Sequence, residues 1–482
     1  MLFNSINFAF FLPIVFILYW FIFKNSLKNQ NILLLLASYI FYSCWDWRFL
    51  FLLVFSTLLD YYTGIKMCES DERTNRKKWF WLSISINLGF LGIFKYYNFF
   101  AESFISLLSN FGVHISSFTL HVILPVGISF YTFHGLSYVI DIYKGRIKAE
   151  KNFIDYSLFV SFFPLLVAGP IERATHLLPQ IKKARVFNYE NAVNGLKQIL
   201  WGLFKKVVIA DNCAHFANII FDGSDTYPGS TIFLGALFFT FQIYGDFSGY
   251  SDIALGVARL FGIDLLRNFA FPYFSRDIAE FWRRWHISLS TWFKDYLYIP
   301  LGGSKGSIWI KVRNTFIIFL VSGFWHGANW TFIIWGLLNA LYIMPSIIFN
   351  TNRNNIEIVA AGKLFPTFRE LISIIITFLL TVIAWIFFRA ENVEQAFLCI
   401  SKIFSISVFS KIYIPEINIA LLTIGLTLFF MIIEWIGRTD QFAIETIFAK
   451  KPKFIRWSFY YLLIIIIFVF AGSNQQFIYF QF

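Results

Sequence analysis

Long apolar runs separated by short polar or basic segments recur along the whole chain. A helical crossing of a bilayer needs about 20 mostly apolar residues. The pattern therefore predicts an all-α polytopic membrane protein with roughly 11–13 membrane helices and additional re-entrant or amphipathic helices. The predicted spans are residues 7–23, 30–43, 49–65, 79–97, 118–140, 155–170, 197–222, 229–246, 315–335, 336–350, 370–388, 417–436 and 457–473.

Charge in the N-terminal loops predicts an orientation. The first apolar run has neither a basic leading segment nor a small-residue cleavage site, so we interpret it as a retained span and not a signal peptide. Basic side chains follow the first, third and fifth predicted spans, and cytoplasmic loops are enriched in such residues, so we expect the N-terminus outside. We expect residues 101–115 to lie in the membrane interface. The basic residues are Lys24, Lys28, Arg73, Arg76, Lys77, Lys78, Lys144, Arg146, Lys148 and Lys151.

Composition agrees with a membrane location. Of the 482 residues, 58% are hydrophobic and 14% charged, against about 25% charged in soluble domains. Mean hydropathy is +0.64. The net charge of +12 indicates basic cytoplasmic loops and not nucleic-acid binding. The four cysteines are far apart and form no C-x-x-C pair, so neither a metal site nor a disulfide framework is predicted.

Residues 261–313 differ from the rest of the chain. Basic and aromatic side chains are mixed there, and no uncharged run is long enough to span. We expect amphipathic or re-entrant helices that the rest of the protein covers. Because no repeat or linker divides the chain, residues 1–482 are predicted to form a single membrane domain, in which 457–482 are the C-terminal helix and its tail.

His326 is the only acid or base between Thr315 and Asn352. The first half of this stretch is predicted to cross the membrane with His326 near mid-depth, where an ionisable side chain is costly and marks a functional site. A buried neutral imidazole can act as a general base. The alternative is a histidine that is hydrogen-bonded between helices.

The motif VSGFWHGANW surrounds this histidine. In a continuous helix Ser322 and Asn329 share the face of the imidazole, so these two residues and Trp325 are predicted to support the site. Asn329 could orient the imidazole or donate to a developing oxyanion. Gly323 and Gly327 would let another backbone or a substrate approach closely.

A second histidine, His286, lies in the segment SRDIAEFWRRWHISLSTWFKDYLYIPLGG. We predict one helix that is capped by Ser275 and ended by Pro300. Its aromatic residues recur at helical spacing, which places His286 and Trp285 on a stripe facing the interior. The alternative is a hydrogen-bonded core histidine.

Two carboxylates, Asp246 and Asp252, interrupt an otherwise apolar run. They are predicted to be structural, capping helices or holding arginines of residues 261–313. In a further motif, FFPLLVAGPIER, Pro164 and Pro170 bracket a short span, which is typical of a broken or re-entrant helix that lines a cavity.

The chain ends with AGSNQQFIYFQF, in which Tyr479 is the only phenol. Aromatic anchoring at the interface is the usual role of such a segment. The alternative is that the Tyr479 hydroxyl accepts an acyl group.

Together these motifs, in particular FWRRWHISLSTWFKDYLYIPLGGS, VSGFWHGANWTFIIWG and IYGDFSGYSDIALGVARLFG, resemble the membrane-bound O-acyltransferase superfamily. The similarity is to its bacterial branch, which contains the membrane subunit of alginate O-acetyltransferase and the teichoic-acid D-alanyl transfer protein. The resemblance implies helices around a funnel or tunnel, with His326 as the essential histidine and His286 at the second family position.

The resemblance also implies a reaction. An acyl group, expected to be acetyl from acetyl-CoA or a carrier-protein thioester, would cross from the cytoplasm through the bacterial inner membrane. Tyr479 would be an acyl relay, because a similar tail in the D-alanylation system belongs to a small separate protein. A secreted hydrolase-like partner and an exported polysaccharide would receive the group, and no bound cofactor or metal is expected.

Four other functions are alternatives from the sequence. A D-alanyl transferase for teichoic-acid-type polymers, or a lipid-directed acyltransferase, would use the same chemistry. A transporter or flippase would also have polar residues within the membrane, but it would be expected to show repeats, which the chain lacks. A scaffold without activity would not need both histidines in their motifs.

Overall fold

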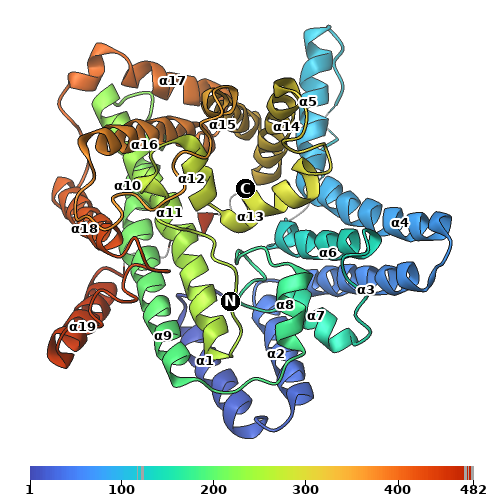
Figure 1. The fold of residues 1–482 in the computed structure, drawn as a ribbon. Helices are drawn as coiled ribbons and strands as arrows, with labels where there is room; N and C mark the ends of the chain where they lie inside the picture. Colours follow the sequence, from blue (N-terminus) through green and yellow to red (C-terminus); the bar gives the residue numbers. More distant parts are fainter. Residues whose placement is uncertain (117, 121–123, 472–474, 476, 479–482) are drawn as a thin grey trace. The chain divides into compact units, whose positions relative to one another are not determined.

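The computed structural model describes residues 1–116, 118–120, 124–471, 475, 477 and 478. Every regular element in this part of the chain is helical, with 19 α-helices joined by loops and short π- or 3₁₀-helices (Figure 1). The all-α prediction is therefore confirmed. The chain divides into two compact units, Met1–Tyr189 with Ala258–Leu266 and Glu190–Val257 with Arg267–Phe482. A single domain over residues 1–482 stays a prediction.

The first unit is held together by polar contacts between apolar helices. On α3 the buried carboxylate of Asp60 accepts from Ser83 Oγ (2.6 Å) and Asn87 Nδ2 (2.8 Å), both on α4. Gly135 of α6 lies against the same carboxylate, and a methyl group there would be 2.0 Å from Asp60 Oδ2. The helices of this unit are α1 Ile6–Ile17, α2 Leu27–Ser43, α3 Arg48–Glu69, α4 Arg73–Leu91, α5 Tyr97–Asn110, α6 Ile128–Tyr143, α7 Phe153–Ser161 and α8 Ala174–Ile181.

Between α7 and α8 the backbone is irregular yet buried, over residues 162–173. It is held by His134 of α6, whose Nε2 accepts from the backbone N–H of Glu172 (3.1 Å) while Nδ1 donates to Val160 O (3.4 Å). Irregular backbone at depth needs such internal partners. The break in the helix that Pro164 and Pro170 predicted is confirmed.

The second unit contains both candidate histidines. Its α14 and α15 lie side by side (Figure 1), because Gly323 of α14 and Gly336 of α15 face each other. A methyl group at Gly323 would lie 2.3 Å from Phe332 O, so the close approach predicted for this glycine is confirmed. The helices are α9 Tyr189–Leu203, α10 Asp211–Asp222, α11 Gly229–Leu260, α12 Ile278–Arg284, α13 Ile287–Phe293, α14 Ile308–His326, α15 Trp330–Ile348, α16 Phe368–Arg389, α17 Val393–Ile403, α18 Ile417–Ile436 and α19 Lys453–Val469.

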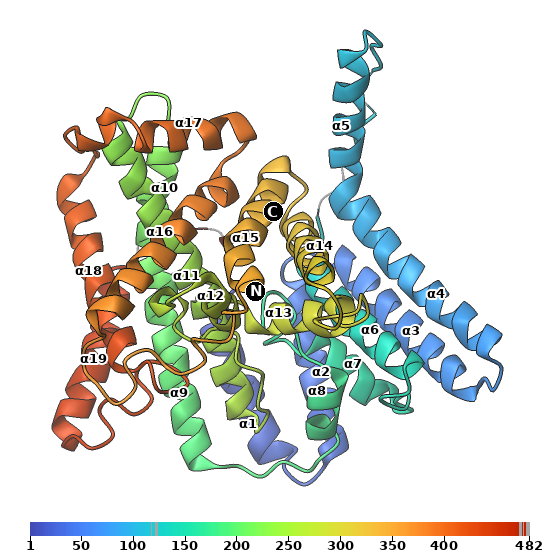
Figure 2. The same cartoon turned by 45° about the horizontal axis from the view of Figure 1, so that its top comes forward.

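In the described part of the chain, five helices are long and apolar enough to cross a membrane, namely α3, α14, α15, α16 and α18. The predicted span 229–246 lies within the longer α11, which has 32 residues. Other predicted spans are shorter helices or bend through π-helices, as α4 does before it continues into α5 (Figure 2). The total of roughly 11–13 crossings therefore stays a prediction.

Candidate active site

The segment around His286 is not the single helix that its periodicity predicted. It is capped at Asp277, whose side chain accepts from Glu280 N, and not at Ser275. The helix ends after Arg284 and restarts as α13 at Ile287, with His286 between them in the left-handed region (φ 44°). The cause is a neighbouring stretch, since Ala270 N donates to Arg284 O and Ile287 N donates to Asn268 O, each at 2.9 Å.

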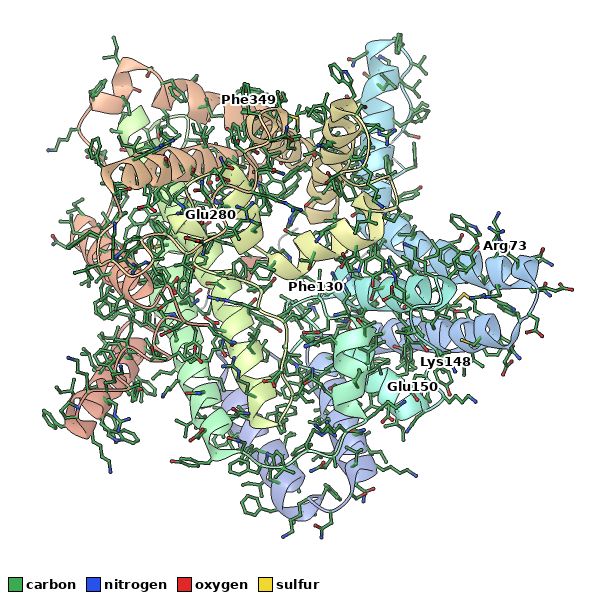
Figure 3. The ribbon with its side chains drawn as sticks, in the orientation of Figure 1. Arg73, Phe130, Lys148, Glu150, Glu280 and Phe349 are labelled. Atoms are coloured by element: carbon green, nitrogen blue, oxygen red, sulfur yellow. The ribbon has the colours of Figure 1, made fainter. Side chains whose placement is uncertain are left out.

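Ionic contacts hold α12 in place beside this break. Glu280, labelled in Figure 3, is buried and forms ion pairs with Arg276 (3.1 Å) and Arg284 (2.8 Å). Both arginines also reach the carbonyl oxygen of Glu357 in the loop before α16. Basic residues that the sequence assigned to an amphipathic segment therefore fix a loop and a helix around His286.

The imidazole of His286 is 1% exposed and has a defined tautomer. Its Nδ1 lies 3.0 Å from Asn268 Oδ1, which also accepts from Ser288 Oγ (2.9 Å), while Asn268 Nδ2 donates to Ser251 Oγ (3.2 Å). Nδ1 therefore carries the proton and Nε2 carries the lone pair. Burial lowers the pKa of His286 to about 3, so the ring is neutral near pH 7. Among the described residues, Nε2 has no hydrogen-bond partner.

The segment around His326 also breaks where a continuous helix was predicted. His326 is the last residue of α14, so the predicted continuous span over residues 315–335 is wrong. Its position near mid-depth of the membrane stays a prediction. Gly327 follows in an extended conformation, and a methyl group there would lie 2.1 Å from the Phe332 ring. Asn329 caps α15 by accepting from Thr331 N (3.0 Å).

Asn329 is consequently not placed as predicted. Its Oδ1 serves the cap, and its Nδ2 donates to the backbone oxygen of Glu391 (2.8 Å). The helical face that was to carry Ser322, His326 and Asn329 together ends at His326. Ser322 stays on α14, one turn before the histidine, and is buried.

The two histidines are brought together. Their ring centroids are 6.5 Å apart, and His326 is 5% exposed. Trp325, Trp335 and Phe388 surround the His326 ring, with centroids 4.8, 5.0 and 5.3 Å away. A pair of imidazoles within an apolar aromatic wall is an environment in which neutral histidines can act as bases.

The tryptophans predicted to support the site have different positions. Trp325 lies against both imidazoles, 6.1 Å from the ring of His286. Trp285 lies one layer further out and packs on Phe269 and Trp385, each with centroids 5.0 Å away. Trp325 therefore lines the site, and Trp285 supports its wall.

Asp246 and Asp252 form ion pairs with lysines, while Arg267 of residues 261–313 is attracted to Asp252 without a direct ion pair. Adjacent lysines in the π-helix η3, Phe204–Ala210, reach α11: Lys206 pairs with Asp246 (2.7 Å) and Lys205 with Asp252 (2.6 Å). The sequence indicated that these two lysines form ion pairs, because cations buried within the predicted span 197–222 require carboxylate partners. Tyr479 lies outside the described residues.

A cavity of about 500 Å³ opens between the π-helix η5 (Lys294–Tyr298), α14 and α15, within the size range of ligand pockets. Its polar wall carries Lys294, Lys311 and Arg353, and none of the described residues that line it is acidic. Phe319 forms part of the apolar wall and lies seven residues before His326 on α14, roughly 10 Å at helical rise. No pattern in the sequence indicated this pocket. Among the described residues, no cluster of three or more possible metal-binding side chains is present.

Comparisons with known proteins identify the chain. The family model for the membrane-bound O-acyltransferase family matches residues 147–388. A protein named probable alginate O-acetylase AlgI from Pseudomonas aeruginosa is 39% identical over 94% of this chain and 84% of its own length.

Two other relatives represent different polymers. The peptidoglycan O-acetyltransferase of Helicobacter pylori is 40% identical over 82% of this chain and 78% of its own length. The teichoic acid D-alanyltransferase of Bacillus subtilis is 30% identical over 45% of this chain and 57% of its own length. The chain belongs to the membrane-bound O-acyltransferase family.

Proposed function

We propose that the protein transfers acetyl groups from a cytoplasmic thioester across the bacterial inner membrane for O-acetylation of an exported polysaccharide. The observation that carries this proposal is the pair of buried imidazoles of His286 and His326, 6.5 Å apart. Two relatives named for O-acetylation of alginate or peptidoglycan align over most of the chain and support the choice of acetyl.

In the proposed reaction His326 is the general base. It takes the proton of an attacking hydroxyl, whose oxygen bonds to the thioester carbonyl carbon; the C–S bond then breaks and the proton passes to the leaving thiolate. The attacking hydroxyl has one proton, and His326 takes it. His286 therefore orients a second donor group of the reactants, from which its Nε2 lone pair accepts. It cannot donate from Nε2 to an oxyanion, because its proton is on Nδ1 beside Asn268.

The basic pocket supports an anionic donor. Lys294, Lys311 and Arg353 match the phosphates of acetyl-CoA or of the phosphopantetheine arm of an acyl carrier protein. Phe319 lies on both the pocket wall and α14, so an acyl chain that follows this helix is directed to His326.

On the outer side, we propose that the acyl group leaves through Tyr479 to a secreted hydrolase-like partner and then to the glycan. D-alanyl transfer is the second candidate. It is less favoured because the named D-alanyltransferases align with 45% of the chain. The transporter or flippase is set aside because the family match and these relatives are transferases.

The test is acetylation of the exported glycan by cells that express His326→Ala, with the amount of protein in the membrane measured. Loss of a general base predicts roughly a hundredfold or greater fall. The control is His215→Ala, because His215 is a half-exposed histidine of the same unit, paired with Glu416. Full acetylation in the His326 variant would remove the catalytic role, whereas full acetylation by Tyr479→Phe would remove only the relay.

A further inference from the structure

The described part of the C-terminal tail is bound through its backbone. Ile478 N donates to Asp246 Oδ2 (2.7 Å), and Gln475 O accepts from Lys206 Nζ (3.3 Å). Ile478 is fully buried and Phe477 is 2% exposed, with the Phe477 ring 5.0 Å from that of Tyr250 on α11. Residues 475, 477 and 478 are therefore bound to α11 and η3 of the second unit.

The ion cluster is complete only with the tail in place. The ammonium of Lys206 has three donors, and its partners are Asp246 (2.7 Å), Asp211 (2.9 Å) and the tail carbonyl of Gln475. Two carboxylates share this single cation, so the cluster has an excess of acceptors, and the Ile478 N–H satisfies one of them. Without the tail a buried donor and a buried acceptor would lose partners, which is costly.

We propose that Lys206 and Asp246 form a tail seat, a binding site for the C-terminal segment of this chain, and that a seated tail is required for acyl transfer. The requirement rests on the proposed function, whereas the seat itself does not. Asp246 is then a positioning residue that acts through the tail, and not merely a structural carboxylate of α11.

The seat recognises the direction of the tail and one aromatic side chain. One backbone carbonyl and one backbone N–H, three residues apart, bond to a cation and an anion respectively, so the tail cannot bind in the reverse direction with the same contacts. Phe477 adds an apolar contact on Tyr250. In the sequence, Tyr479 follows Ile478 directly.

The neighbouring ion pair provides a matched control. Lys205 and Asp252 come from the same two elements, η3 and α11, and Asp252 also accepts from Gln198 Nε2 (2.9 Å). These partners all lie outside the tail. Loss of Asp252 therefore tests the general effect of removing a largely buried, lysine-paired carboxylate from α11, and loss of Asp246 tests the tail seat.

The experiment measures maleimide labelling of Ile478→Cys in full-length protein in which the exposed Cys44 and Cys68 are replaced by serine. With Asp246 intact, labelling should be slow because position 478 is buried. Adding Asp246→Ala should speed labelling roughly tenfold or more, since a hydrogen bond to a charged group is lost. Adding Asp252→Ala should leave the rate near that of the parent.

Two results would overturn the seat: fast labelling in the parent, or equally slow labelling after Asp246→Ala. Glycan acetylation is measured in parallel on the same substitutions without Ile478→Cys. If Asp246→Ala speeds labelling of position 478 but leaves glycan acetylation at the parent level, a seated tail is not required for acyl transfer. If the parent protein shows no acetyl transfer at all, the proposed function fails while the labelling result still decides the seat.

Discussion

Asn268 determines which nitrogen of His286 is basic. Its carbonyl oxygen faces Nδ1 at 3.0 Å and is itself oriented by Ser288 and by the bond from Nδ2 to Ser251. Such outer partners fix the tautomer and orientation of functional histidines. A water-exposed asparagine would rotate, but Asn268 is 1% exposed and bonded at both ends.

We therefore expect Asn268→Ala to lower kcat roughly ten- to a hundredfold, as removal of outer partners of histidine does elsewhere. Asn268→Asp should retain more activity, because the carboxylate still accepts from Nδ1. It should also raise the pKa of His286 from about 3, since a nearby anion favours the imidazolium. More imidazole is then protonated at low pH, so the acidic limb of the pH–rate profile should move to higher pH.

The control for this prediction is Ser251→Ala, which removes the bond on the far side of the Asn268 amide and keeps the acceptor at Nδ1. Its acidic limb should match that of the wild type. An unshifted limb in Asn268→Asp would contradict the proposed role of Asn268, even if overall activity fell.

The sequence indicated some of these residues and not others, for a physical reason. His286 and His326 are conspicuous because ionisable groups are rare in apolar segments, and the structure brings them together. Asn268 is one polar residue in a mixed segment, and its role depends on a contact across 18 positions. Lys206 could have been predicted from its charge, but its partners Asp246 and Gln475 could not.

For helices, too, the sequence indicates local features and not those that depend on tertiary contacts. Periodicity correctly predicted that helices carry both histidine motifs, yet each helix breaks next to its histidine, at His286 and after His326. The helical spacing of aromatic and apolar residues continues through both breaks, so this spacing could not predict where the helices break. The break at His286 is stabilised by backbone bonds from residues 268–270, a tertiary contact that overrides local propensity.

Where η5, Lys294–Tyr298, meets α14, the basic pocket provides a prediction about the donor. Lys311→Ala should raise the KM for acetyl-CoA roughly three- to tenfold with little change in kcat, because a partly exposed charge contact contributes to binding and not to the transition state. A phosphate-free acetyl thioester should show no such change. Lys305→Ala is the control, because Lys305 is a nearby exposed lysine outside the pocket lining. An equal effect on both donors would contradict phosphate recognition.

At the scale of the first unit, basic loops that are distant in sequence lie at one end. Arg76 donates to the carbonyls of Ile142 and Tyr143, and Ala149 N donates to Cys68 Sγ. Arg73 and Lys148 are found at this end in Figure 3. Loops that are both predicted to be cytoplasmic are thus neighbours, as a single membrane orientation requires.

Two native cysteines can test that orientation. Cys44 precedes α3 and Cys68 lies near its end, and both are exposed, whereas Cys213 and Cys399 are buried. A helix of 22 residues is roughly 33 Å long, close to the thickness of a hydrocarbon core. Positive loops inside then place Cys44 outside and Cys68 in the cytoplasm. A membrane-impermeant maleimide should label wild-type protein in intact spheroplasts, Cys44→Ser only after permeabilisation, and Cys68→Ser as the wild type. Labelling of Cys68 in sealed spheroplasts would reverse the topology, and with it the side from which the thioester donor is supplied.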